Sequence, residues 1–506
     1  MKTFISLLTL CATVGLLNAQ VDYYVSEYGD DSNDGLSESA PFATLLAAND
    51  AIVADEALDT IPGVYVINIS GTVSAGGSSS FKTNEATEVT VKGSSPATDV
   101  IQMVDDATFA EASADFGRIF DMTNAASTNV KLIVQDLTIK NFGFIPKKSW
   151  GAGALCNQKN DYFELKGCVI KNAGSRSGTI TQTMTDNTVF KMSNCYVSDL
   201  YSYIGQAGVF SPIRVRLGEA TVNNCIFNSI SKDFEASGYT PEADAEINNA
   251  TVITVGDASG TYATKATITN NTFINCKVTA GSSISGMPQS VIMVDTINEI
   301  GVEALIANNL LIDNLADPSH VDILNLWGDI EDSIIIVNNV MNAQTGISEE
   351  DNDVNADYSY TSEEIAIPVE SGMAQVFTSP EGMMYVKAEG TSVVGKADTS
   401  YTTAVDIIGT ERDAEAPTIG AYEYTVNTGL KTVEDIDFAI YPNPSDGKVS
   451  IILPSTADIT VYNQIGQSIV KRSSVNTLEI NDLNSGVYII KVSNSNGTKA
   501  KQLIVR

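Results

Sequence analysis

The sequence predicts an all-β protein: a parallel β-helix solenoid followed by a small C-terminal antiparallel β-sandwich. Short strands recur about every thirty residues, and each closes on a small residue or an Asn-Asn pair followed by bulky apolar residues, which predicts the solenoid. Leu137 and Cys168, at equivalent places in two repeats, are 31 residues apart, and Leu310 and Val340 are 30 apart. Regularly spaced strands with turn residues between them predict the sandwich. A sandwich or a propeller throughout is the alternative, although no repeat shows the four strands of a propeller blade.

The first 19 residues predict a signal peptide that is removed from the mature chain. Lys2 precedes an apolar run from Phe4 to Leu17, and Leu17-Asn18-Ala19 ends on a small residue, as at a cleavage site. No later run is long and apolar enough to cross a bilayer, so we expect no transmembrane segment.

Residues 20–60 predict a cap over the open N-terminal end of the solenoid. A strand at 23–26 and a turn at 29–35 precede a short amphipathic helix at 41–51. The apolar side of this helix is expected to hold Phe42, Leu45, Leu46 and Ile52. Such a cap would cover apolar surface and an unpaired strand edge.

The turn at 29–35 imitates the start of a calcium-binding loop. Asp30, Ser32 and Asp34 have the right spacing, but Pro41 stands where the bidentate Glu of such a loop belongs. We therefore expect Asx turns leading into the cap.

The coils are predicted to begin within residues 60–130 and to run regularly from 131 to 341. In the unit Pro212–Asn228, two short strands are broken at Gly218. Ile213, Val215 and Leu217 alternate with Arg214 and Arg216, so the two arginines should point away from the core. Asparagine is expected at the corners because it tolerates left-handed backbone angles and can bond to the next turn.

Three motifs resemble secreted bacterial right-handed β-helix proteins, many of which are grouped with polysaccharide lyases. They are the Tyr-Val-Ser strand with its Asp-Gly turn, the Pro-Phe-Ala-Thr-Leu sequence at 41–45, and a closing segment with the stretches 406–412 and 419–424. The resemblance implies that residues 20–424 form one β-helix domain with its cap at 20–60.

Beyond a linker at 425–436, residues 437–506 resemble the C-terminal sorting domain of the type IX secretion system of Bacteroidota. The resemblance is carried by Tyr441-Pro442-Asn443-Pro444, by Leu483–Val492 and by the final strand Lys501–Arg506. It implies a secreted or cell-surface protein that is exported across the outer membrane, with the type IX secretion machinery as a partner. An appended carbohydrate-binding sandwich is the alternative.

Charge is unevenly distributed along the chain. The net charge is −33 with an isoelectric point near 4.2, which argues against a nucleic acid as partner. Between Lys131 and Lys232, however, 12 Lys and Arg face 6 Asp and Glu. A basic sector on an acidic protein favours a polyanionic ligand.

The thiols and the single histidine restrict the chemistry. Cys168, Cys195 and Cys225 fall at the same place in three successive repeats, so they should stack inside the coil as a reduced ladder, with a disulfide between neighbours as the alternative. His320 is the only histidine, so a His-rich metal site is impossible and a Ser-His-Asp triad would depend on one loop residue. Acid and base catalysis must then use carboxylates, Lys, Arg or Tyr.

These groups favour cleavage of an acidic, uronic acid-containing polysaccharide by β-elimination. The site must neutralise the sugar carboxylate with Arg or Ca²⁺ and supply a base, so Ca²⁺ is the one cofactor considered. We expect catalytic roles for Arg214, Arg216 and Lys232, and substrate-binding roles for Arg176 and Lys191, all lining one groove on adjacent turns. The stretch 213–218 loosely resembles the Arg-containing strand of β-helix alginate and chondroitin lyases, without the acidic residue expected before Arg216.

Two other functions remain open. A non-catalytic surface protein that binds glycans or cells would need only the groove, since outward Arg and Lys can also serve solubility. A β-helix glycoside hydrolase would need two facing carboxylates, for which Asp295, Asp322 and Asp329 are the candidates. In each case the protein is expected to be a monomer.

Overall fold

A computed structural model describes most of the chain as two compact units, residues 1–424 and residues 425–506. The predicted signal peptide, 1–19, and the linker, 425–436, lie outside the described residues. The described residues are 20–56, 63–79, 87–110, 117–122, 130–143, 155–158, 161–175, 178–183, 185, 187–202, 209–233, 248–256, 264–274, 276, 291–295, 302–312, 323–327, 334–341, 347–349, 359–361, 393–424, 438–464, 467–494 and 497–506.

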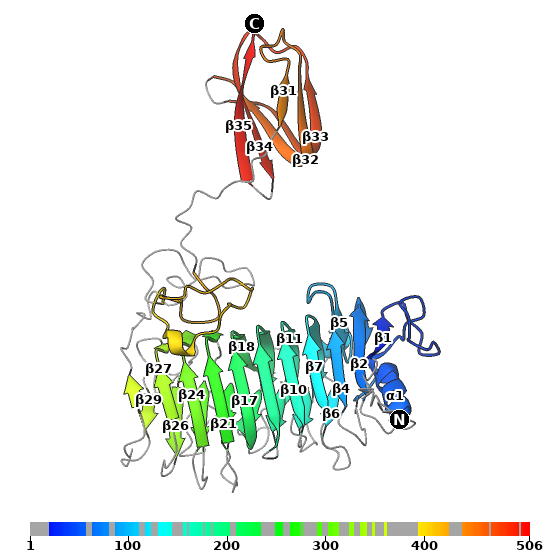
Figure 1. Ribbon diagram of the computed structural model, residues 1–506, viewed down its shortest axis with the longest axis vertical. Helices are drawn as coiled ribbons and strands as arrows, with labels where there is room; N and C mark the ends of the chain where they lie inside the picture. Colours follow the sequence, from blue (N-terminus) through cyan, green and yellow to red (C-terminus); the bar gives the residue numbers. More distant parts are fainter. Residues whose placement is uncertain are drawn as a thin grey trace, which may run out of the picture. The chain divides into compact units, whose positions relative to one another are not determined.

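The first unit is built from three parallel sheets that run its whole length (Figure 1). Within the described residues, sheet A contains β1 (Gln20–Ser26), β2 (Val64–Ser70), β4 (Glu88–Lys92), β7 (Lys131–Gln135), β10 (Tyr162–Lys166), β13 (Val189–Ser193), β17 (Gly218–Asn223), β21 (Thr264–Thr269), β24 (Val302–Ala307), β27 (Ile334–Val337) and β30 (Ser359–Thr361). Sheet B contains β3 (Thr72–Ser74), β5 (Val100–Gln102), β8 (Thr138–Gly143), β11 (Val169–Ser175), β14 (Tyr196–Ser202), β18 (Ile226–Asp233), β22 (Thr272–Ile274), β25 (Leu310–Ile312) and β28 (Val340–Met341). Sheet C contains β6 (Phe120–Met122), β9 (Cys156–Gln158), β12 (Thr181–Thr183), β16 (Ile213–Val215), β20 (Ile253–Val255), β23 (Ile292–Asp295), β26 (Ile323–Trp327) and β29 (Ile347–Glu349).

Successive strands of the chain visit the sheets in a fixed order. In one coil the chain passes from β16 in sheet C to β17 in sheet A and then to β18 in sheet B. Each strand pairs in parallel with the equivalent strand of the next coil, as β17 does with β21. A minor pair, β15 (Val209–Phe210) and β19 (Asn248–Ala250), lies outside these sheets. The predicted parallel β-helix is therefore confirmed.

A column of left-handed residues turns the chain from sheet A into sheet B. From β7 to β27, one residue of each coil has a φ between +51° and +61° at this corner: Asp136, Gly167, Asn194, Asn224, Asn270, Asn308 and Asn338. Asn, Asp and Gly adopt this backbone conformation at lower cost than other residues. The predicted role of asparagine at the corners is confirmed.

The residue that follows the left-handed corner residue in each of these coils points into the core, and these residues form a second column. Its first members are Leu137, Cys168, Cys195 and Cys225, and its last are Asn271, Asn309 and Asn339. All five described cysteines are buried and reduced, as expected for a thiol ladder.

The three buried asparagines bond to one another along the helix axis. Asn271 Nδ2 donates to Asn309 Oδ1 at 3.0 Å, and Asn309 Nδ2 donates to Asn339 Oδ1 at 2.9 Å. The same two oxygens also accept the backbone N–H of the preceding coil, at 3.0 Å each. Buried amides without such partners would cost stability, so the ladder fixes the register of these coils.

Aromatic side chains fill the core between the sheets. Phe163 and Phe190, in register in sheet A, have ring centroids 5.8 Å apart, and Phe227 and Phe273 in sheet B stack at 4.9 Å. Each pair buries large apolar area between neighbouring coils. This is the contact that a single repeat could not make alone.

The cap closes the N-terminal end with helix α1 (Leu45–Glu56), visible beside β1 in Figure 1. The predicted helix at 41–51 is thus shifted: Phe42 precedes it and bridges to Val25, and Leu46 is only half-buried while Leu45 and Ile52 are in the core. The expected Asx turns are confirmed, since Asp30 accepts the Ser32 N–H at 2.8 Å and Asp34 accepts the Leu36 N–H at 3.1 Å. A short helix, α2 (Asp106–Ala110), lies next to β8.

Residues 393–424, which include the short helix η3 (Thr399–Tyr401), pack on the outer side of sheet B and are called the strap here. Val393, Ile419 and Tyr422 of the strap form an apolar cluster with outward side chains of sheet B, including Leu310 and Ile312. The strap thereby covers an apolar part of the outer surface of the β-helix.

The outward corner asparagines hold the strap by hydrogen bonds. Asn224 donates to Val405 O at 2.7 Å, Asn270 to Tyr401 O at 3.0 Å and Asn308 to Asp398 O at 2.9 Å. Arg412, 2 % exposed, donates to Asn224 Oδ1 and pairs with the equally buried Glu423 at 3.3 Å. This buried pair, with its further bonds to backbone carbonyls, anchors the strap at one coil.

The second unit is an antiparallel sheet whose core is made by its own strands. Its described strands are β31 (Ala439–Tyr441), β32 (Val449–Tyr462), β33 (Ser468–Ile480), β34 (Gly486–Asn494) and β35 (Gly497–Val505). Ile459, Val461, Ile490 and Leu503 are fully buried in its core. An antiparallel C-terminal domain, as predicted, is confirmed.

We expect Asn309→Ala to destabilise the β-helix by about 3 kcal/mol or more, because it removes the side-chain partners of the Asn271 backbone N–H and of the Ile268 carbonyl, and one hydrogen bond from each of the side-chain amides of Asn271 and Asn339. Cys195→Ala, in the same column, removes only a small apolar group and should cost about 1 kcal/mol. Urea or thermal unfolding followed by circular dichroism compares the two variants. Equal losses would contradict the role given to the ladder.

We expect Gly218→Ala to destabilise more than Gly409→Ala, although both glycines have a φ of +83°. A Cβ at Gly218 would lie 2.3 Å from the carbonyl oxygen of Thr188, whereas nothing lies within 4 Å at Gly409. Gly409→Ala should cost about 1 to 2 kcal/mol for the backbone conformation, and Gly218→Ala about 1 to 3 kcal/mol more for the clash. The unfolding midpoints measure the difference, and equal midpoints would refute the clash.

Candidate functional site

Sheet C presents a row of polar side chains on its outer face. In β16, Ile213 and Val215 are fully buried in the core, so Arg214 between them points outward and is half-buried. Arg214 lies opposite Gln182 of β12 and Thr254 of β20. Further along sheet C, Asp121 of β6 pairs with Arg118 at 3.5 Å. One guanidinium thus lies among neutral hydrogen-bonding groups on an extended face.

Gln182 lies next to Arg214 in this row. The residue is 2 % exposed, and among the described residues its Oε1 has no hydrogen-bond donor. A buried amide oxygen without a donor costs about 1–3 kcal/mol, so such atoms call for a structural explanation.

Arg216 follows β16 directly, at the corner where sheet C passes into sheet A, and is half-buried. Its backbone N–H donates to Thr183 Oγ1 at 3.0 Å, and its carbonyl accepts from Thr264 Oγ1 at 3.0 Å. Thr183 and Thr264 belong to the preceding and following coils, so the backbone of Arg216 is held between them. Two of the three predicted catalytic residues thus lie within three positions of one another, one on β16 and one at its end.

The other predicted residues do not join this pair. Lys232 lies in β18 of sheet B, opposite Tyr201, and Lys191 lies in β13 of sheet A, opposite Glu164. Arg176 lies outside the described residues. The strands thus place Lys191 and Lys232 on sheets other than that of Arg214, and a groove lined by all five residues stays a prediction. Residues about one turn apart share a face only when they occupy equivalent register positions, and these two do not.

Lys191 already belongs to a network on the outer face of sheet A. Its Nζ lies 5.4 Å from the centroid of the Tyr162 ring, and Lys131 Nζ lies 5.6 Å from the same centroid. The Tyr162 hydroxyl donates to Glu164, and burial together with this carboxylate raises the pKa of Tyr162. Lys131 in turn pairs with Glu88 at 2.9 Å. This mixed network favours a structural role for Lys191.

The described residues do not fit a calcium site near Arg214. Within the described part of the chain, no three acidic, His or Cys side chains lie close enough together to hold a metal ion. The hydrolase candidates Asp322 and Asp329, and His320, fall outside the described residues. Asp295 is the last residue of β23 in sheet C, opposite Trp327.

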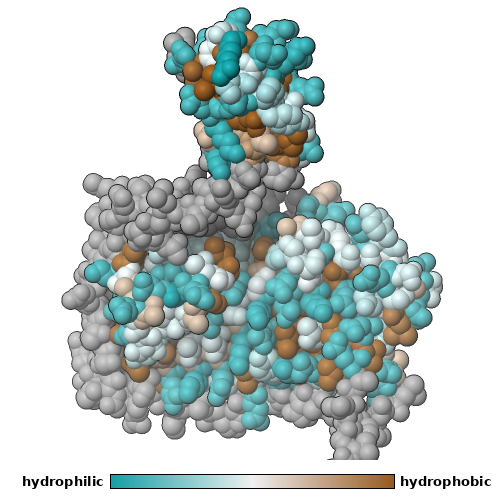
Figure 2. Space-filling model, turned by 45° about the horizontal axis from the view of Figure 1, so that its top comes forward, coloured by the Kyte–Doolittle hydropathy of each residue, from teal (hydrophilic) through white to brown (hydrophobic). Residues whose placement is uncertain are grey.

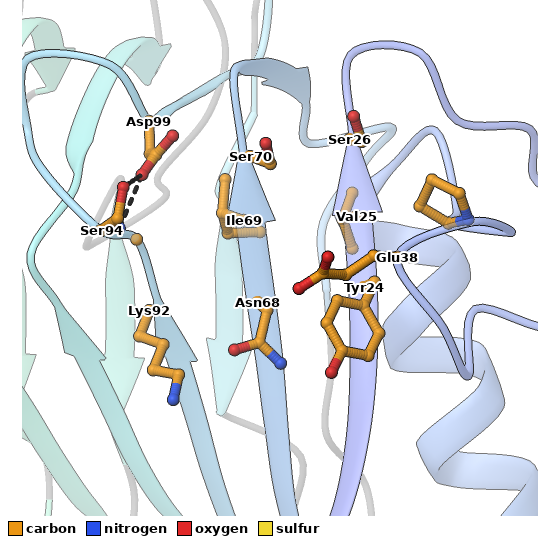
Figure 3. A pocket seen from close by; sticks show the side chains of 12 residues that line it. Tyr24, Val25, Ser26, Glu38, Asn68, Ile69, Ser70, Lys92, Ser94 and Asp99 are labelled. Atoms are coloured by element: carbon orange, nitrogen blue, oxygen red, sulfur yellow. Dashed lines mark hydrogen bonds between the residues drawn. The ribbon is translucent and has the colours of Figure 1, made fainter.

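A pocket at the N-terminal end of sheet A was not predicted from the sequence. Its floor is formed by Tyr24, Asn68 and Lys92, which come from three strands separated by 44 and 24 residues. Figure 3 shows Asn68 between Tyr24 and Lys92 on neighbouring strands. The only signal in the sequence is that each is an outward residue of an alternating strand. They lie side by side because of the register of these strands, which cannot be read from the irregular spacing of the first coils.

The surface gives no sign of insertion into a bilayer by a helix. Among the described residues, no helix has the length and apolar character needed for a membrane span. In the view of Figure 2, hydrophilic side chains cover much of the described surface, and apolar side chains form small separate patches.

Comparison with known proteins identifies one part of the chain. Residues 439–506 match the family model described as "Secretion system C-terminal sorting domain". No curated protein matches the chain significantly.

Distant likenesses exist among solved structures. Pectate lyase Pel9A shares 11% identity over 81% of this chain and 98% of its own, with a TM-score of 0.35. A rhamnogalacturonan lyase shares 12% identity over 63% and 68%, with a TM-score of 0.25. These values are too low to transfer a substrate or a residue role.

The identity of the C-terminal unit determines where the protein acts. Its antiparallel strands and the family match agree with the sorting domain predicted from the Tyr441–Pro444 motif and the terminal strand. A domain of this kind directs its cargo through the outer membrane. The chain is therefore a secreted β-helix protein that carries a type IX secretion system C-terminal sorting domain and is delivered to the cell surface across the outer membrane.

Proposed function

We propose that the protein is a secreted polysaccharide lyase that cleaves a uronic acid-containing glycan bound along the outer face of sheet C. The observation that carries the proposal is the placement of Arg214 on the outward side of β16, within a row of polar side chains, with Arg216 directly after this strand. An extended sheet face suits an extended polymer, and a guanidinium suits a carboxylate because it donates two parallel hydrogen bonds.

β-Elimination needs a base and a group that stabilises negative charge on the substrate carboxylate. A base removes the proton on the carbon next to the carboxylate, the bond from the neighbouring carbon to the glycosidic oxygen breaks, and a carbon–carbon double bond forms. Negative charge accumulates on the carboxylate during this step, so Arg214 would stabilise the transition state more than the substrate. The departing oxygen takes up a proton.

The base is proposed to be Arg216 or Lys232. Arg216 is fixed at the end of the strand that carries Arg214. Lys232 lies near the end of β18, from which the chain leaves sheet B toward the next strand of sheet C. No step is assigned to Ca²⁺, because the described residues near Arg214 offer no suitable ligand set.

A second function, a non-catalytic glycan-binding protein of the cell surface, is favoured by one observation. Lys191 and Lys232 lie in other sheets, so Arg214 is the predicted site residue that the described structure places within sheet C, with Arg216 directly after its strand. Two arginines suffice to hold a carboxylate, and a binding protein needs no base. Delivery to the cell surface suits this function as well as a lyase.

The test is incubation of the secreted protein with pectate, alginate and chondroitin while the ultraviolet absorbance of unsaturated ends is followed. We expect absorbance to rise with one of them, and Arg214→Ala to lower the rate by about 100-fold or more. Lys191→Ala, which changes a lysine on sheet A, is the matched control and should stay within about twofold. Arg216→Ala and Lys232→Ala identify the base.

Other outcomes point elsewhere. Retention on a glycan column without absorbance would support the binding protein. New reducing ends without absorbance would indicate hydrolysis and overturn the lyase. Wild-type activity in Arg214→Ala would remove sheet C as the site.

A further inference from the structure

The pocket at the N-terminal end of sheet A has a volume of about 650 Å³ and lies on a different sheet from the Arg214 row (Figure 3). Tyr24, Asn68 and Lys92 are directly opposite one another in β1, β2 and β4. Their neighbours Val25 and Ile69 are buried in the core, so the three side chains point outward, and each is half-buried. The floor thus combines an aromatic ring, an amide and an ammonium group.

One wall is the cap loop that carries Glu38 and Pro41. Asp31 fixes this loop by accepting the N–H groups of Ala43 and Thr44 at 2.8 and 2.9 Å, and Asn33 donates to Pro41 O at 2.8 Å. Because its hydrogen bonds tie the loop to the cap, the wall is preorganised rather than formed by the ligand.

The opposite wall is the turn that follows β4, with Ser94 and Asp99. Asp99 is 4 % exposed and accepts hydrogen bonds from Ser94 N, Ser94 Oγ and Gly71 N at 2.6, 2.7 and 3.1 Å. Burial raises the pKa of Asp99, but these hydrogen bonds outweigh it and lower the pKa overall. Asp99 is therefore an ionised structural group whose oxygens are already used.

The two remaining charged groups of the pocket are available to a ligand. Among the described residues, neither Glu38 nor Lys92 has a hydrogen-bond or ion-pair partner, whereas Lys131 and Lys265 on the same sheet face pair with Glu88 and Glu303. The pocket thus offers one cation and one anion on separate sides, with Asn68 between them and the Tyr24 ring next to Glu38.

We propose that this pocket is a second glycan-binding site that holds one uronate residue. Lys92 would bind the carboxylate, the Tyr24 ring would cover the apolar face of the sugar, and Glu38 and Asn68 Oδ1 would accept sugar hydroxyls. A sulfate or phosphate fits less well, because Glu38 would repel a more highly charged anion. A neutral sugar would leave Lys92 without a partner.

The choice of a uronate rests on the polymer class of the proposed function, but the site is physically distinct from sheet C. Two sites on different sheets would let one protein hold two stretches of polymer, or two chains. Such bivalency raises the apparent affinity for a polymer well above that for a short oligosaccharide.

Calorimetry with tetragalacturonate and with tetramannuronate tests the proposal, using maltotetraose as the neutral counterpart. We expect two binding events for a uronate tetramer and none for maltotetraose. Lys92→Met and Tyr24→Ala should each weaken the pocket event by about tenfold or more and leave the other unchanged. Lys166→Met is the matched control, since Lys166 is exposed two coils along the same outward column and lies outside the pocket.

The variants separate this proposal from the one for sheet C. If Lys92→Met abolishes one event and Arg214→Ala the other, both hold. If Arg214→Ala changes nothing and Lys92→Met abolishes the only event, the pocket stands and sheet C fails. The pocket proposal is overturned if Lys92→Met and Tyr24→Ala, folded as judged by their unfolding midpoints, bind like the wild type. It is also overturned if neither uronate binds, or if maltotetraose binds equally.

Discussion

The structure depends on the corner between sheets A and B, where the coils from β7 to β27 place their left-handed residues one above another. Asn224, Asn270 and Asn308 meet this need with backbone angles that a branched or bulky side chain would adopt only at a cost. Once the corner is fixed, the strand before it and the strand after it have no freedom of register. The alignment of Arg214 with Gln182 lies in coils that have this corner, whereas that of Tyr24 with Asn68 is made by the pairing of β1 with β2 at the cap end.

Much of this fold could be predicted from the sequence because the repeated positions hold residue types with narrow backbone preferences. The Asn-Asn pairs and the stacked cysteines gave the corner and the core column correctly. The start of helix α1 was placed too early, since Phe42 has the spacing of a helix residue but pairs with Val25 through its backbone. The function of the strap as a cover on sheet B could not be predicted, because the asparagines that bind it are the same ones that make the corner.

Only the part of the candidate site that follows from the alternation of inward and outward residues in one short stretch could be predicted from the sequence. The outward direction of Arg214 follows from its place between the inward Ile213 and Val215, and Arg216 lies directly after the same strand. Lys191 and Lys232 were placed beside them by sequence distance, and a coil of about thirty residues with three corners can put such residues on any of three faces. The pocket formed by Tyr24, Asn68 and Lys92 could not be predicted from the sequence for the same reason. Long-range register, rather than residue chemistry, is what the sequence alone leaves undefined.

The reduced thiols have a practical consequence for an exported protein. Cys156, Cys168, Cys195, Cys225 and Cys276 are all sealed inside the solenoid, and burial raises the pKa of the first three thiols. A thiol reagent in the medium can reach them only when a coil separates from its neighbours. The native chain thus contains five internal reporters, spaced along the middle of the β-helix, whose labelling rates would reveal where the stack first comes apart.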